Sequence, residues 1–144
     1  MIGMIVSGHG EFARGITSAM TLIGGKPTQF YAIDFIEGDT TEILEGSMIN
    51  ALEALKECDG VIICTDLAGG SPFKSACIVS MEMENVEVIA GVNLPLCIEL
   101  NVMRQFESDA KTLADQMVEI AKEQILRFEY VVVDKTDYEA EDGI

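Results

Sequence analysis

The sequence predicts an α/β fold: an open, doubly wound sheet of four parallel strands plus a C-terminal antiparallel edge strand, with helices on both faces. Short β-branched apolar runs alternate along the chain with longer segments whose apolar residues recur at helical spacing. The run 60–65 is apolar throughout, which is typical of a central strand covered by helices on both sides. Strands that alternate with helices at this density favour a doubly wound parallel sheet.

The first two strands frame the first helix. The β-branched run 2–7 is the first expected strand, and a helical pattern over 11–22 follows almost at once. A short segment with two glycines and a proline stops this helix. The second expected strand, 29–33, begins directly afterwards.

The middle of the chain repeats this order. A helix is expected over 39–56, where Asp39 as N-cap and Glu42 three positions later match a capping box. The central strand 60–65 follows, and a third helix is expected over 72–80, beginning at a proline.

The last third supplies one more parallel strand, 86–90, followed by a helix or broken helix over 95–105 and a longer helix over 108–124. The final apolar run, 128–133, leaves no room for a crossover helix. We therefore expect it to pair antiparallel at a sheet edge, either in this subunit or in a neighbour.

Length and charge restrict the class of protein. The 144 residues suit one domain, expected at 1–133, followed by an acidic tail at 134–144 that we expect to be solvated and mobile. A net charge of −16 argues against nucleic-acid binding and favours a protein partner with a basic face. No apolar stretch approaches the roughly 20 residues that cross a bilayer. The start has no signal-peptide pattern, so a cytosolic protein without direct membrane insertion is expected.

The cysteines predict neither a metal site nor a disulfide framework. The four of them form no CxxC pair, and the chain has only one histidine to join them. Each lies in or beside an apolar segment, which favours reduced, buried thiols. We expect no metal and no cofactor.

The single histidine, His9, lies between two glycines at the expected carboxyl end of the first strand, where open α/β sheets bind ligands. Asp66 stands at the corresponding end of the third strand. A carboxylate that accepts a hydrogen bond from one ring nitrogen fixes the tautomer and leaves the other nitrogen free to attack. We predict that His9 is a nucleophile and that Asp66 orients it and stabilises its developing charge.

An anion site is predicted next to this pair. Gly69 and Gly70 allow close backbone approach, Ser71 is expected at the N-cap, and Pro72 at the first helical position. Free backbone N–H groups and the helix dipole would then bind a phosphoryl group. The same residues also suit an ordinary strand-to-helix turn with a good cap. Together with His9 and Asp66, however, they predict transient phosphorylation of His9 by another phosphoprotein, because no Walker-type loop is present.

The chain resembles the IIA component of the mannose-type (mannose/fructose/sorbose) family of the bacterial phosphoenolpyruvate:sugar phosphotransferase system over roughly residues 1–125. The matching segments are 8–13, Asp34-Phe35 with Gly38, Asp66 with 69–73, and 88–95.

The resemblance implies that His9 accepts a phosphoryl group from phospho-HPr and passes it to a histidine of a IIB component, and so reaches a membrane IIC/IID complex indirectly. Asp66 would be the hydrogen-bonded partner, with Gly69, Gly70 and Ser71 holding the phosphoryl oxygens. The resemblance also implies a homodimer in which a C-terminal strand, here 128–133, crosses to the other subunit. It leaves the sugar open.

Two features depart from the family's pattern. Gly8 stands where many relatives have Ser or Thr, so a hydroxyl contact is either missing or supplied by Ser7. The tail beyond Val133 has no counterpart in the pattern. Asp34, at the end of the second strand, is expected to order its loop rather than to take part in catalysis.

Other functions fit the sequence less well than sugar phosphotransfer. A related phosphotransfer subunit of a dihydroxyacetone kinase is the nearest alternative, but the segments 69–73 and 91–95 favour the sugar permeases. A hydrolase using His9, Asp66 and Ser71 is disfavoured because an N-cap role would occupy the serine hydroxyl. A flavin-binding module lacks the expected hydroxyl-rich loop, and a regulatory module would differ by failing to pass the phosphoryl group on.

Overall fold

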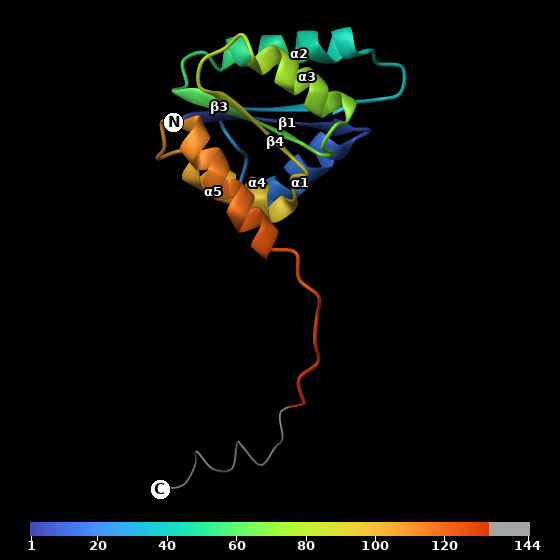
Figure 1. Cartoon of the computed structure of the whole chain (residues 1–144), viewed down its shortest axis with the longest axis vertical. Helices are drawn as coiled ribbons and strands as arrows, with labels where there is room; N and C mark the ends of the chain where they lie inside the picture. Colours follow the sequence, from blue (N-terminus) through green and yellow to red (C-terminus); the bar gives the residue numbers. More distant parts are fainter. Residues whose placement is uncertain (133–144) are drawn as a thin grey trace, which may run out of the picture.

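The computed structural model describes residues 1–132 and has three layers (Figure 1). A four-stranded sheet lies between helices α2 and α3 on one face and α1, α4 and α5 on the other. The elements are β1 Ile2–His9, α1 Phe12–Gly24, β2 Phe30–Phe35, α2 Thr41–Ala54, β3 Gly60–Thr65, α3 Ser71–Ser80, β4 Val86–Ala90, α4 Leu94–Met103 and α5 Ala110–Glu123.

The sheet has the order β2-β1-β3-β4, and all of its pairings are parallel. β1 and β3 are the central strands, which explains their nearly continuous apolar sequences. The register places Ser7 beside Thr65 and His9 beside Phe35. All four strands therefore end at one edge of the sheet, with His9 at the end of β1.

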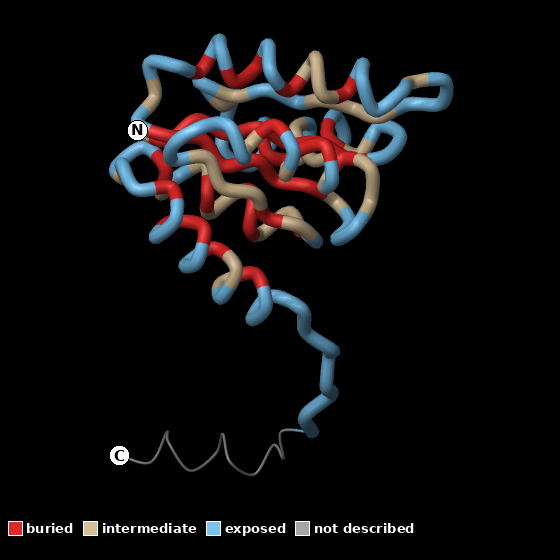
Figure 2. The backbone as a smooth tube through the Cα atoms, turned by 45° about the horizontal axis from the view of Figure 1, so that its top comes forward, coloured by how far each residue is buried: buried red, intermediate tan, exposed pale blue. Residues whose placement is uncertain are grey.

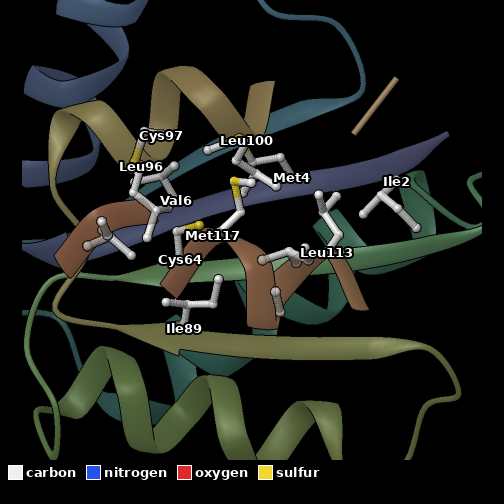
Figure 3. Packing of buried hydrophobic residues seen from close by; sticks show 14 of the residues in the cluster. Ile2, Met4, Val6, Cys64, Ile89, Leu96, Cys97, Leu100, Leu113 and Met117 are labelled. Carbon is white, nitrogen blue, oxygen red and sulfur yellow. The ribbon is translucent and has the colours of Figure 1, made fainter. Parts of the chain in front are cut away.

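Two buried clusters stabilise the layers, one on each face of the sheet. The larger lies between the sheet and α1, α4 and α5, and the smaller between the sheet and α2 and α3. Figure 3 shows side chains of the larger cluster converging from strands and helices: Met4, Val6, Cys64, Ile89, Leu96, Leu100, Leu113 and Met117. Burying a side chain of this size contributes about 1.5–3 kcal/mol, so the central strands hold the fold together. Figure 2 shows the same concentration of burial at the sheet.

The helix starts differ in detail from the prediction. The N-cap of α2 is Thr40, whose hydroxyl accepts from the backbone N–H of Ile43, and not Asp39. Asp39 instead accepts from the backbone N–H of Ile36 and shapes the preceding loop. Both side chains suit a cap, and the loop conformation decides between them.

The predicted antiparallel edge strand does not form among residues 1–132. Helix α5 ends at Glu123, and residues 128–132 are exposed and have no strand partner (Figure 1). The last residue of that prediction, Val133, and the predicted tail 134–144 lie outside the described residues. An apolar alternating run specifies a strand only where a sheet edge is available to it within reach.

The cysteines are free thiols, with Cys64 and Cys97 fully buried in the larger cluster. Among residues 1–132, no helix has both the length and the apolar character needed to cross a membrane.

Candidate functional site

His9 is the last residue of β1, and its side chain is 45% exposed at the carboxyl edge of the sheet. The flanking glycines have separate roles. A Cβ on Gly8 would lie 2.4 Å from a ring carbon of Phe12, so only glycine lets α1 pack this closely. Gly10 has a φ of 58°, which turns the chain into α1 and is costly for other residues. The local sequence therefore leaves the imidazole accessible at a rigid strand end.

Asp66 follows β3 and holds His9 through two contacts. Its Oδ2 accepts from the backbone N–H of His9 at 2.8 Å and lies 2.8 Å from the Nδ1 atom of the ring. A carboxylate at that position favours the tautomer with the proton on Nδ1. The Nε2 lone pair is then directed away from Asp66 and is free to act as a nucleophile.

The environment of Asp66 favours its charged form. Its side chain is only 14% exposed, and this burial raises the pKa of the carboxyl group. Hydrogen bonds from the backbone and ring of His9, the charge of the ring and the backbone of Leu67 outweigh burial, so the pKa is lower than usual. Asp66 is therefore a carboxylate at neutral pH, able to stabilise positive charge on the imidazole.

The loop after β3 brings the start of α3 against the imidazole. Gly69 has a φ of 78°, and Gly70, with an ordinary φ of −69°, is the N-cap of α3. A Cβ on Gly70 would lie 2.8 Å from Cε1 of His9 and 3.6 Å from Nε2. Glycine is needed at 69 for its backbone conformation and at 70 for the space it leaves beside the ring.

Ser71 is the first helical residue rather than the predicted N-cap, and Pro72 follows it in the first turn. No side chain caps α3, so the first amides of this helix are not covered by a local hydroxyl or carboxylate. The Ser71 hydroxyl is therefore not occupied by an N-cap role, contrary to the prediction. In the described part of the chain, however, no hydrogen bond joins Ser71 to His9, as a serine hydrolase would require.

Two residues from β2 support the site. Asp34 accepts from the backbone N–H and the Nε atom of Arg14, at 3.1 and 3.0 Å, and so orders the first turn of α1. Phe35 packs edge-on against the imidazole, with ring centroids 5.9 Å apart. The register of β1 and β2 creates this contact, and no local pattern in the sequence indicates it.

Ser7, considered as a source of a hydroxyl contact, is fully buried. Its hydroxyl and Oδ1 of Asp66 are buried atoms without a hydrogen-bond partner among residues 1–132. Within the same residues, no group of three or more His, Cys, Asp or Glu side chains is placed to hold a metal ion. The site is thus built from an imidazole, a carboxylate and backbone amides.

Known proteins are similar to this chain in sequence and in fold. The family described as "PTS system fructose IIA component" matches residues 3–118. A fructose-specific EIIA component of Bacillus subtilis is 27% identical, covering 87% of this chain and 90% of the relative. A mannose-specific EIIAB component of Escherichia coli is 29% identical over 93% of this chain, which spans only 42% of that relative's length.

Solved structures agree with these sequence relationships. The crystal structure of an EIIA component from Streptococcus agalactiae has a TM-score of 0.82 and 27% identity, covering 88% of this chain and 97% of that one. A mannose/sorbose-specific IIA subunit from Enterococcus faecalis has the same TM-score at 19% identity and supports the fold alone. From its sequence match and its fold, the chain belongs to the family of IIA components of the sugar phosphotransferase system.

Proposed function

We propose that this chain is a phosphocarrier in which Nε2 of His9 accepts a phosphoryl group from phospho-HPr and passes it to a histidine of a IIB component. The contact between Oδ2 of Asp66 and Nδ1 of His9, at 2.8 Å, carries the proposal. It fixes the tautomer and leaves Nε2 as the reactive atom.

The transfer needs no cofactor. The Nε2 lone pair forms a bond to phosphorus while the bond to the donor's leaving atom breaks and that atom keeps its electron pair. The proton on Nδ1 stays in the hydrogen bond with Asp66, which balances the positive charge that develops on the ring. Transfer to IIB is the same displacement, with His9 as the leaving group.

The start of α3 provides the phosphoryl-binding site in this proposal. The amides of Gly69 and Ser71 are the proposed backbone donors. The N–H of Gly70 already donates to the carbonyl of Leu67 at 3.1 Å, and Gly70 supplies space beside the ring. The positive end of the helix dipole favours an anion there. The Ser71 hydroxyl, not used as a cap, is the proposed side-chain donor to a phosphoryl oxygen.

The proposed partners follow from surface charge and family membership. A chain with a net charge of −16 attracts carriers that present basic surfaces, as proposed here for HPr and the IIB component. The relatives' names mention fructose- and mannose-specific systems, which supports a role in sugar uptake and phosphorylation. The proposed location is the cytoplasm, with the IIC/IID membrane complex reached only through IIB.

A homodimer with an exchanged C-terminal strand is also proposed. β4 is an edge strand, and a cavity of about 170 Å³ opens where β4 meets α5. Residues 128–132 include four exposed large apolar side chains, and three of them, Phe128, Tyr130 and Val132, alternate along the chain and could pair there on a second subunit. Light scattering of the full chain and of a chain ending at Glu123 tests this, since only the full chain is expected to be dimeric.

The phosphocarrier proposal is tested by intact-protein mass spectrometry after incubation with phosphoenolpyruvate, enzyme I and HPr. We expect one acid-labile phosphoryl adduct on the natural chain and none on His9→Ala. No adduct on the natural chain, under conditions that phosphorylate HPr, would overturn the proposal. An adduct that survives in His9→Ala would move the site elsewhere.

A further inference from the structure

Lys74 differs from most cationic side chains of this acidic protein because it has no ion-pair partner within residues 1–132. Arg104 binds backbone carbonyls, and most of the remaining described cations pair with carboxylates: Arg14, Lys56, Lys111, Lys122 and Arg127. Lys26 shares the property with Lys74 but lies between α1 and β2, at the opposite edge of the sheet from His9. Of these two lysines, Lys74 is on α3, whose N-cap Gly70 lies beside the imidazole.

Lys74 lies one helical turn after the residue of α3 that abuts His9. The backbone N–H of Lys74 donates to the carbonyl of Gly70, the N-cap of α3, at 3.0 Å. A Cβ on Gly70 would lie 2.8 Å from Cε1 of His9, so the start of the helix is in contact with the ring. Lys74 is on the exposed side of α3, and its side chain starts about 6 Å further along the helix axis than Gly70.

The direction and length of the side chain bring its charge back toward the ring. Helical side chains lean toward the N-terminus of their helix, which for α3 is the end beside His9. Lysine has a flexible four-carbon stem that ends in a compact charge with three donors. Lys74 is exposed, so its ammonium is free to swing over Gly70.

We propose that Lys74 contacts the phosphoryl group on Nε2 of His9 and supplies the side-chain positive charge that this group requires, a role that rests on the proposed function. A phosphoryl group brings about −1.5 to −2 charges close to the Asp66 carboxylate. Backbone amides and the helix dipole contribute only partial charges. A mobile ammonium offsets the repulsion when the phosphoryl group arrives and moves away when it leaves.

The test compares Lys74→Met, Lys74→Arg and the matched control Lys26→Met, all exposed positions where these residues keep the fold. The first measurement is phosphorylation by phospho-HPr. We expect Lys74→Met to lower the equilibrium ratio of phosphorylated IIA to phospho-HPr by about 3- to 10-fold, as loss of one partly exposed charge contact predicts. Lys74→Arg should restore most of that ratio, and Lys26→Met should match the natural chain.

A second measurement separates contact with the phosphoryl group from docking of the donor. Phosphorus-31 NMR of isolated phosphorylated protein follows the second ionisation of the phosphoryl group, in the absence of HPr. Loss of a neighbouring cation should move this titration to higher pH in Lys74→Met but not in Lys26→Met. Identical titrations in both variants would overturn the proposal, as would an unchanged equilibrium ratio.

Failure of the underlying function has a different signature. If the natural chain takes up no phosphoryl group, or if His9→Ala still does, the proposed function fails and the role of Lys74 fails with it. If the natural chain is phosphorylated at His9 while Lys74→Met behaves like the natural chain in both measurements, only the role of Lys74 is wrong.

Discussion

The two ends of the sheet differ in how far their polar groups are hydrogen-bonded. At the amino end, Arg104 is 1% exposed, and its guanidinium donates to the backbone carbonyls of Thr28, Gln29 and Ile2 and to the side chain of Asn101. At the carboxyl end, Nε2 of His9 points away from its carboxylate and the amides at the start of α3 have no capping side chain. Hydrogen-bonded polar groups stabilise the amino end, whereas the carboxyl end keeps polar groups available for the reaction proposed above.

The stability of the amino end of the sheet depends on one buried charge, that of Arg104. Burial lowers the pKa of the Arg104 guanidinium, yet arginine stays protonated in proteins, so the charge must be compensated by its hydrogen bonds. These bonds join the end of α4 to β1 and to the segment before β2. The side-chain contacts at the carboxyl end, between Arg14 and Asp34 and between His9 and Asp66, involve partly exposed side chains, and the imidazole remains accessible.

The largest effect on stability is expected at the amino end. Arg104→Ala leaves the buried carbonyl of Ile2 and the part-buried carbonyls of Thr28 and Gln29 without this donor, and should reduce the free energy of unfolding by about 3–5 kcal/mol. Urea unfolding followed by circular dichroism measures this change. His9→Ala is the matched variant for the carboxyl end and should stay within about 0.5 kcal/mol of the natural chain. Equal losses in the two variants would contradict the division between the ends.

The largest effect on transfer is expected from Asp66→Asn. The amide cannot hold the same tautomer or balance charge on the ring, so the rate of phosphorylation by phospho-HPr should fall by roughly 10- to 100-fold. Rapid-quench measurement of phosphorylated protein gives this rate. A rate within a factor of two of the natural chain would show that Asp66 does not orient His9.

Gly70→Ala should reduce transfer more modestly. The added Cβ would lie 2.8 Å from Cε1 of His9, so the ring or the loop must shift, and a several-fold loss of rate is expected. Gly15→Ala is the control, because Gly15 lies in α1 with open space around it. That control should keep the rate and increase stability by about 0.5–1 kcal/mol. A loss of rate in Gly15→Ala but not in Gly70→Ala would contradict the role of Gly70 beside the imidazole.

The smallest effect concerns pH. The pKa of Asp66 is lower in the folded protein than its usual value, so its contribution to stability is complete above the pKa of the unfolded chain, near 4. This contribution is lost as the pH falls from there through the folded pKa. Urea unfolding at neutral pH and near pH 3 should therefore show a smaller acid-induced loss for Asp66→Asn than for the natural chain. Equal acid-induced losses of stability in the two proteins would mean that the charged form of Asp66 is not stabilised by its contacts.

Much of this architecture could be predicted because it depends on local patterns. Apolar periodicity placed the four parallel strands and their helices, and the rule that parallel strands end at one edge brought His9 and Asp66 together. The glycines at 69 and 70 also predicted a segment whose backbone can lie close to a bound anion. Each of these inferences needs only the sequence neighbourhood of a residue and the direction of its strand.

The N-cap assignments show where local patterns stop being sufficient. Asp39 and Thr40 are adjacent and both suit a cap, as do Gly70 and Ser71, and in each pair the structure selects the residue that was not predicted. The choice depends on where the preceding loop delivers the chain, and that is set by the packing of the strand before it. The fifth strand is not formed among residues 1–132 for a related reason, since an alternating run needs a partner edge, and pairing with a second subunit stays a prediction.

The sequence by itself determined the parallel α/β class, the strand ends that carry His9 and Asp66, and the acidic character of the chain. Only the tertiary structure decided that Phe35 supports the imidazole, that Asp34 orders α1, and that Arg104 closes the amino end. Each of these contacts joins elements that are distant in sequence. Their side chains meet through the strand order, the register and the packing of helices on the sheet, which arise only when all layers assemble.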